Sequence, residues 1–116
     1  QEQPEAMEQD DREGIVRNYL DMLLPDDWDS MDYYRRREYI RDIDDPTRAE
    51  GTVKRQTVSN IEIWGECFGK SKEEMRPSDS YAISAIMAKI EGWQKMSKKS
   101  RFGIYGAAAG YERTEV

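Results

Sequence analysis

The second half of the sequence holds several short helix signals in a row, and a candidate β-hairpin follows them. Ser59 and Glu62 have the spacing of a capping box, in which the serine caps a backbone N–H and the glutamate reaches back. A second signal of this kind comes next, and Pro77 stands just ahead of a third helix. Residues 93–96 and 101–105 flank a polar, lysine-rich link and predict the hairpin. Helix, helix, helix and hairpin is the order of a winged helix-turn-helix domain.

The same helix signals predict which residues are buried. Gly69 can end the first helix in a left-handed conformation, and Ser71 with Glu74 forms the second capping box. Apolar residues recur at helical spacing in the first and third helices, so each has one face that needs a partner. These two faces are expected to pack against each other. The predicted core residues are Ile61, Trp64, Phe68, Ile83, Ile86, Ile90 and Phe102.

Two further helices and a strand are expected ahead of this region. Apolar positions recur with a helical period over residues 12–24, and Pro25 stops that helix. A second helix is expected to start near residue 29 or 30 and to run to about residue 42. Residues 52–58 alternate and hold β-branched side chains, which predicts a short strand that pairs with the hairpin.

These patterns divide the chain into three parts. Residues 1–10 are rich in Glu and Gln and are expected to form a disordered linker. Residues 11–50 are predicted to be a helical N-terminal extension, and residues 51–116 a winged-helix-like domain. The predicted fold class is therefore mainly α with a small β-hairpin, a winged helix-turn-helix-like domain preceded by two helices.

Charge is distributed unevenly along the sequence. The 116 residues carry a net charge of −6. Residues 1–50 hold 16 acidic and 7 basic residues, which gives −9, whereas residues 51–116 hold 8 and 11, which gives +3. The charge of the whole chain does not indicate a nucleic-acid-binding protein, but the second half taken alone could bind nucleic acid weakly.

Three consecutive arginines, residues 35–37, allow two interpretations. They could form a nucleic-acid-binding patch, or they could lie on a solvated helix face and pair with nearby acids. Asp32 and Glu38 lie close to them in the sequence. Interleaved opposite charges at helical spacing usually form local ion pairs, so we favour the solvated face.

The residue inventory excludes several classes of site. The chain has no histidine, so it cannot build a Ser-His-Asp triad, a Cys-His pair or a histidine zinc site. Cys67 is the single cysteine, which fits a reducing, cytoplasmic compartment and a buried structural thiol. No apolar run approaches the roughly 18 residues of a membrane span. We therefore predict a chain that is not an enzyme, with no catalytic residue, cofactor, metal site or membrane contact.

Several short stretches stand in a fixed order between residues 12 and 113. They are residues 24–29 (LPDDWD), 50–55 (EGTVKR), 62–66 (EIWGE), 68–70 (FGK), 79–83 (DSYAI), 92–93 (GW), 101–106 (RFGIYG) and 111–113 (YER). In this order and spacing, the chain resembles the C-terminal region of virulence-associated protein E family proteins. Those are prophage and mobile-element proteins that couple a superfamily-three, AAA+-type helicase to primase-like functions.

The resemblance implies a place for the chain in a longer replication protein. The sequence begins with Gln1, and we expect it to be a fragment whose ATPase motifs lie upstream. The upstream helicase domain of the same protein is the implied partner, and oligomers could form through it. In the family, the segment after residue 106 often carries Gln-Arg, whereas this chain has alanine at residues 107–109. That departure would remove a polar, basic contact with phosphate.

We therefore predict a non-catalytic accessory domain of a phage- or prophage-type replicative helicase-primase that contacts DNA non-specifically. In a winged helix the third helix faces the groove, and the wing contacts the backbone. Serines on that helix specify little, while basic residues of the wing predict salt-sensitive binding. The candidate nucleic-acid-binding residues are Lys54, Arg55, Ser80, Ser84, Lys89, Lys95, Lys98, Lys99 and Arg101.

The alternative is a protein-interaction module that docks on the helicase ring or on a replication partner. The charge of −9 over residues 1–50 favours this alternative, because that charge repels DNA unless it faces away. The surface distinguishes the two functions. A contiguous positive strip from residues 95–101 to Lys54 and Arg55 favours DNA, whereas a broken strip beside an exposed apolar patch favours a protein partner.

Overall fold

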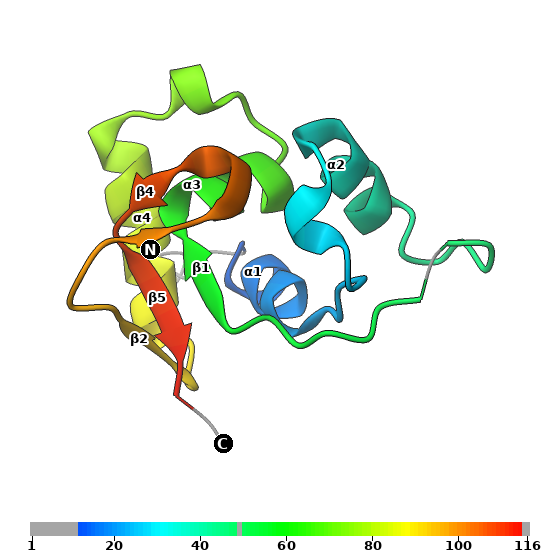
Figure 1. Cartoon of the computed structure of the whole chain (residues 1–116). Helices are drawn as coiled ribbons and strands as arrows, with labels where there is room; N and C mark the ends of the chain where they lie inside the picture. The colour runs from blue at the N-terminus through cyan, green and yellow to red at the C-terminus, as the bar shows by residue number, and fades with distance from the viewer. Residues whose placement is uncertain (1–11, 49, 115–116) are drawn as a thin grey trace, which may run out of the picture.

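Helices make up most of the regular structure, and a small antiparallel sheet lies beside them (Figure 1). The computed structural model describes residues 12–48 and 50–114, so the predicted linker at residues 1–10 lies outside the described residues. The α-helices are α1 (Arg12–Asp21), α2 (Tyr33–Arg41), α3 (Asn60–Glu62) and α4 (Pro77–Lys89). The shorter helical turns are η2 (Trp28–Ser30), η3 (Ile63–Cys67), η4 (Lys72–Glu74) and η5 (Gly103–Tyr105). The strands are β1 (Thr57–Ser59), β2 (Trp93–Lys95), β3 (Ser100–Arg101), β4 (Ala107–Ala108) and β5 (Gly110–Arg113).

The two N-terminal helices form as predicted but are shorter. Helix α1 ends at Asp21, and the chain then makes an isolated antiparallel bridge between Leu24 and Val53. Helix α2 starts at Tyr33, later than predicted, because residues 28–30 form the separate turn η2. Asp32 caps α2, since its Oδ1 accepts a hydrogen bond from the backbone N–H of Arg35 at 2.8 Å.

The main sheet has the strand order β1-β5-β2, and both pairs are antiparallel. Val58 of β1 lies opposite Tyr111 of β5, and Trp93 of β2 lies opposite Arg113. The predicted strand at residues 52–58 is therefore present only at its C-terminal end. In Figure 1 the sheet and α2 lie on opposite sides of the molecule, with α1 and α3 between them.

The predicted hairpin is wrong in its second strand. Strand β2 pairs with β5, residues 110–113, and not with residues 101–105. The intervening chain builds a separate two-stranded piece from β3 and β4, joined by the turn η5. Gly103 and Gly106 have φ angles of 60° and 76°, which interrupt any extended strand through that segment.

The helical region after β1 follows the predicted order with different local geometry. The Ser59–Glu62 capping box is confirmed, and Gly69 adopts the left-handed conformation with φ 71°. Between them only α3 is α-helical. The chain continues as the π-turn η3, in which the N–H of Phe68 bonds to the carbonyl of Ile63. The second predicted capping box is wrong: the Ser71 hydroxyl lies 2.6 Å from a Glu73 carboxylate oxygen, and only the short turn η4 forms.

The hydrophobic core joins both halves of the chain. Its largest cluster consists of Val16, Tyr19, Leu20, Val58, Ile63, Trp64, Ile83, Ile86, Met87, Ile90 and Tyr111. Of the predicted core residues, Trp64, Ile83, Ile86 and Ile90 lie in this cluster, and Phe102 is also buried. Ile61 and Phe68 are half-buried against it. The domain boundary at residues 50–51 stays a prediction. No helix in the described ranges is long and apolar enough to cross a membrane.

Candidate functional site

The predicted nucleic-acid-binding residues fall into exposed and covered groups. The connection from β2 to β3 is exposed at its basic positions, as are Lys54 and Lys89. Lysines and an arginine therefore face solvent along this connection. The exposed candidates on it and at its ends are Lys95, Lys98, Lys99 and Arg101.

Ser80 and Ser84 do not lie on the outward face of α4. Asn60 Nδ2 donates to the Oγ atoms of both serines at 3.0 and 3.1 Å, and Tyr111 lies 3.0 Å from Ser84 Oγ. The two serines are one helical turn apart beside the buried stripe, so they face α3. The exposed residues of α4 are Pro77, Ser78, Tyr81, Ala85, Ala88 and Lys89.

Arg55 is also placed differently from the prediction, which made it part of a surface strip. Its side chain is 4% exposed, and its guanidinium lies 4.3 Å from the centre of the Tyr19 ring. This contact is a cation–π geometry in a desolvated setting. The positive strip from the wing to Lys54 is therefore interrupted at Arg55.

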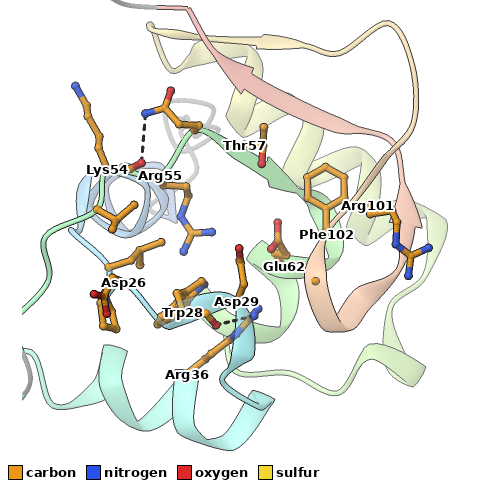
Figure 2. A pocket seen from close by; sticks show the side chains of 15 residues that line it. Asp26, Trp28, Asp29, Arg36, Lys54, Arg55, Thr57, Glu62, Arg101 and Phe102 are labelled. Atoms are coloured by element: carbon orange, nitrogen blue, oxygen red, sulfur yellow. Dashed lines mark hydrogen bonds between the residues drawn. The ribbon is translucent and has the colours of Figure 1, made fainter.

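Arg55 points into a cleft of about 410 Å³ between η2, residues 53–57 and η5 (Figure 2). Trp28 lines the cleft from η2, and Phe102 and Arg101 line it from the opposite side. Lys54 lies at its rim, so three of the predicted cations border the same hollow, Lys54 and Arg55 from residues 53–57 and Arg101 from β3.

Arg36 fits neither interpretation of the arginine run. It is 1% exposed, and its Nη1 and Nη2 donate to Glu66 Oε2 at 2.8 Å and to the Trp28 carbonyl at 2.9 Å. Arg37 Nη1 donates to the backbone carbonyl of Glu66 at 2.6 Å. Only Arg35 of the three is exposed. The run therefore connects α2 to η3 rather than facing solvent.

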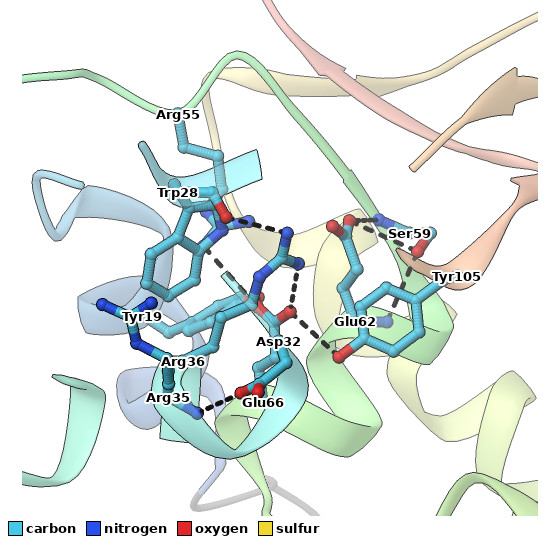
Figure 3. A network of polar contacts seen from close by, with 10 residues as sticks. All are labelled: Tyr19, Trp28, Asp32, Arg35, Arg36, Arg55, Ser59, Glu62, Glu66 and Tyr105. Atoms are coloured by element: carbon cyan, nitrogen blue, oxygen red, sulfur yellow. Dashed lines mark hydrogen bonds and ion pairs between the residues drawn. The ribbon is translucent and has the colours of Figure 1, made fainter. Parts of the chain in front are cut away.

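Glu66 is the centre of a buried polar network (Figure 3). Its side chain is fully buried and accepts hydrogen bonds from the Tyr19 hydroxyl at 2.7 Å, from Arg36, and from the Tyr105 hydroxyl at 2.9 Å. Arg55 Nη2 lies 3.9 Å from its Oε1. Burial raises the pKa of both tyrosines, and the charge of Glu66 adds to the shift, so both phenols stay protonated as donors. One carboxylate thus ties α1, α2 and η5 to η3.

Glu62 is the second buried carboxyl group of this region. Its Oε1 accepts a hydrogen bond from the backbone N–H of Ser59 at 2.8 Å. Burial raises the pKa of Glu62 to about 7, while the charge of Arg55 opposes the shift and that of Glu66 adds to it. Glu62 therefore changes its charge close to neutral pH.

The raised pKa makes stability depend on pH. Between the ordinary value of 4.5 and about 7, the folded protein binds more protons at Glu62 than the unfolded chain does. The stabilisation from this group is complete below pH 4.5 and is lost as pH rises through 7. Glu62→Gln removes the titrating group, so the variant does not lose this stabilisation as pH rises. The free energy of unfolding of the variant minus that of the parent should therefore increase by about 3 kcal/mol between pH 4.5 and 8.

Urea denaturation of parent and variant at intervals of one pH unit measures this difference. The carbonyl of the glutamine can still accept the hydrogen bond from Ser59, so the helix cap is kept. Curves of unfolding free energy that run parallel over the whole range would contradict the raised pKa of Glu62.

Among the described residues, the structure shows neither an activated thiol nor a cluster of metal ligands. Burial raises the pKa of the Cys67 thiol to about 12, so the half-buried thiol is protonated at neutral pH. No group of three or more Cys, Asp and Glu side chains among residues 12–48 and 50–114 is arranged to hold a metal ion.

Comparison with protein-family models gives no match to the chain, and comparison with curated proteins gives none either. The resemblance to virulence-associated protein E family proteins is therefore kept as a proposal.

Reasoning from the sequence missed the buried network. Its unpredicted members are Tyr19, Arg36, Glu62, Glu66 and Tyr105. One signal was available for Arg36, because it stands three residues from both Tyr33 and Tyr39 and so shares the inward face of α2. No comparable local signal identified its partner Glu66.

Proposed function

We propose that this chain is a winged-helix-like accessory module that contacts DNA non-specifically through the wing between β2 and β5. The observation that carries the proposal is the order β1, α3, α4, β2 and β5 after the two N-terminal helices α1 and α2, with β3 and β4 inserted between β2 and β5 and the sheet order β1-β5-β2. A helix pair followed by a strand, a basic connection and a return strand is the arrangement of a winged helix. In a winged helix, the basic connection between the two strands contacts the DNA backbone.

The charge of the wing supports this function. Residues 95–101 hold four cations and no acid, and all four side chains are exposed. Such a segment attracts phosphate and releases counterions on binding, which makes affinity strongly dependent on salt. The exposed face of α4 supports non-specific rather than specific binding. It lacks the Arg, Asn and Gln residues that read base edges.

The wider context is also proposed, on the resemblance alone. The chain would be a C-terminal accessory domain of a phage- or prophage-type helicase-primase acting in the cytoplasm, with its partner helicase domain upstream. It would have no catalytic residue of its own.

A protein-interaction module is the second candidate, and a specific observation favours it. The positive strip is interrupted at the buried Arg55, and Tyr81 on α4 is 76% exposed. Leu23 and Ile43, both about half-exposed, line one surface hollow of about 520 Å³. A broken strip and exposed apolar groups are the features expected of a docking surface.

Removing the wing charges distinguishes the two functions. Lys98→Ala/Lys99→Ala/Arg101→Ala should weaken binding to duplex DNA of any sequence, because phosphate contacts carry no sequence information. Each lost contact should reduce the slope of log affinity against log salt by about 0.9, so the full loss is about 2.7. Fluorescence anisotropy of the full chain at several salt concentrations measures both quantities.

A matched control removes three exposed cations from other elements, as Arg35→Ala/Arg41→Ala/Lys72→Ala. It has the same net charge as the wing variant and should retain most of the affinity and of the salt slope. A wing variant that binds DNA like the parent would remove the wing from the mechanism and favour the docking function.

A further inference from the structure

Buried donors without partners gather at one place in the fold, the cleft between η2, residues 53–57 and η5. Four such nitrogens belong to residues that line it, and no group in the described ranges accepts from them. They are Trp28 Nε1, Arg36 Nε, and Nε and Nη2 of Arg55. Among the remaining described residues, only the acceptor Asn60 Oδ1 is a buried side-chain atom without a hydrogen-bond partner. Buried polar atoms normally have partners, so this concentration indicates a group that binds here.

Of the two buried arginines that line the cleft, Arg55 is the one without a hydrogen-bonded counter-charge. Arg36 is held by Glu66 at 2.8 Å, whereas Arg55 Nη2 lies 3.9 Å from the same carboxylate, too far for a hydrogen bond. Arg55 is nevertheless 4% exposed. A desolvated guanidinium offers a forked pair of donors to an oxyanion, and an oxyanion would supply the missing acceptors.

We propose that this cleft binds a phosphate monoester, with Arg55 as the residue that holds the phosphate and Lys54 and Arg101 at the rim. A doubly charged phosphate suits three cations better than a single carboxylate does. The volume of about 410 Å³ exceeds the needs of a phosphate ion, which leaves room for the organic group of the ester. Trp28 and Phe102 provide aromatic walls for that group.

This site is distinct from the proposed contact of the wing with DNA. An internal phosphodiester carries one charge and continues into sugars on both sides, so it does not fit a cleft closed at one end by buried side chains. A terminal phosphate does fit. Its source could be a free mononucleotide or the phosphorylated 5′ end of a DNA strand, and the test separates these sources.

Glu62 makes occupancy depend on pH. The charged groups that face it are Arg36, Arg55 and Glu66 inside the fold, and Lys54, Arg101, Asp26 and Asp29 around the cleft. A charged Glu62 competes with the phosphate for Arg55 and repels it. Protonation removes this competition, so Glu62 should weaken binding more at pH 8 than at pH 6.

The test is an NMR titration of the full ¹⁵N-labelled chain at fixed salt, following the indole N–H of Trp28 and the Nε–H of Arg55. The ligands are inorganic sulfate, deoxyadenosine monophosphate, and one oligonucleotide with a 5′-phosphate or a 5′-hydroxyl. Saturable shifts of both resonances are expected with the mononucleotide, the 5′-phosphorylated oligonucleotide, or both. Arg55→Gln should weaken that binding about tenfold or more, and Lys98→Ala/Lys99→Ala should leave it within about twofold.

A second variant keeps the test decisive if Arg55→Gln does not fold. The advantage of Glu62→Gln over the parent in affinity for the mononucleotide should be larger at pH 8 than at pH 6, because the second ionisation of the phosphate, at about pH 6, affects binding to both proteins equally. The proposal is overturned if neither monoester shifts the two resonances. It is also overturned if sulfate binds as tightly as the monoesters, or if the 5′-hydroxyl oligonucleotide produces saturable shifts equal to those of the phosphorylated one.

Discussion

Glu66→Gln is expected to lower the free energy of unfolding by about 3–5 kcal/mol, the usual cost of removing one partner from a buried ion pair. Glutamine keeps the size of the side chain but removes its charge. Arg36, which is 1% exposed, then remains buried without a counter-ion, and Arg55 loses its nearest carboxylate. Urea denaturation at constant pH measures the loss.

The matched control is Glu38→Gln on α2. Glu38 pairs with Arg41 at 3.9 Å, and both side chains are 65% exposed, so water already screens this ion pair. Its loss should cost no more than about 1 kcal/mol. Equal effects of Glu66→Gln and Glu38→Gln would show that the carboxylate of Glu66 is not desolvated.

A double-mutant cycle tests the pairing itself. Arg36→Met removes the charge that Glu66→Gln leaves uncompensated, so the double variant should be less destabilised than the sum of the two single variants. A coupling energy near zero would contradict a direct interaction between residues 36 and 66. Both variants that carry Arg36→Met lose the hydrogen bond to the Trp28 carbonyl, so this loss cancels in the cycle.

The features that local sequence patterns predicted well are those that depend on interactions between residues close together in the sequence. The capping box at Ser59 depends on atoms three residues apart, and Gly69 ends its helix because glycine tolerates a positive φ. The buried stripe of α4 follows from its period alone. The coarse fold, helices with a small antiparallel sheet, follows from adding such elements together.

The errors arise where tertiary contacts override a local pattern. Charge spacing placed Arg36 in solvent, but a residue of η3 thirty positions away supplies a counter-charge that the helix itself does not show. Arg55 was likewise predicted to lie on the surface, because no local pattern shows that the ring of Tyr19 from α1 covers it. The strand partner of β2 was missed because glycines at residues 103 and 106 turn the nearer segment away.

The site is accordingly less predictable than the fold. The exposed lysines at residues 95, 98 and 99 could be identified from the sequence, since exposure is the default for lysine. A cleft whose walls come from η2, residues 53–57 and η5 has no signature in any one segment. Its arginines became recognisable as a site only through their burial and their unbonded donors.

Trp64→Ala is expected to cost about 3–5 kcal/mol, because it removes the largest side chain of the main cluster and leaves a cavity. Trp64 is 5% exposed and packs in the cluster with the isoleucines of α4. Its Nε1 also donates to the Ser71 carbonyl at 2.6 Å, and so holds the chain between η3 and η4. A domain of this size typically has only about 5–15 kcal/mol in total, so this loss is a large share of its stability.

Two control variants separate the contributions to this loss. Trp64→Phe keeps an aromatic ring in the cluster but removes the hydrogen bond to Ser71, so it should cost clearly less than the alanine variant. Tyr81→Ala removes a ring that is 76% exposed and should change stability by no more than about 0.5 kcal/mol. Thermal unfolding ranks the three, at roughly 4 °C per kcal/mol for a chain of this length. If Trp64→Ala shifted the melting temperature only as little as Tyr81→Ala, Trp64 would not belong to the core, because an empty site of that size cannot close without loss of packing.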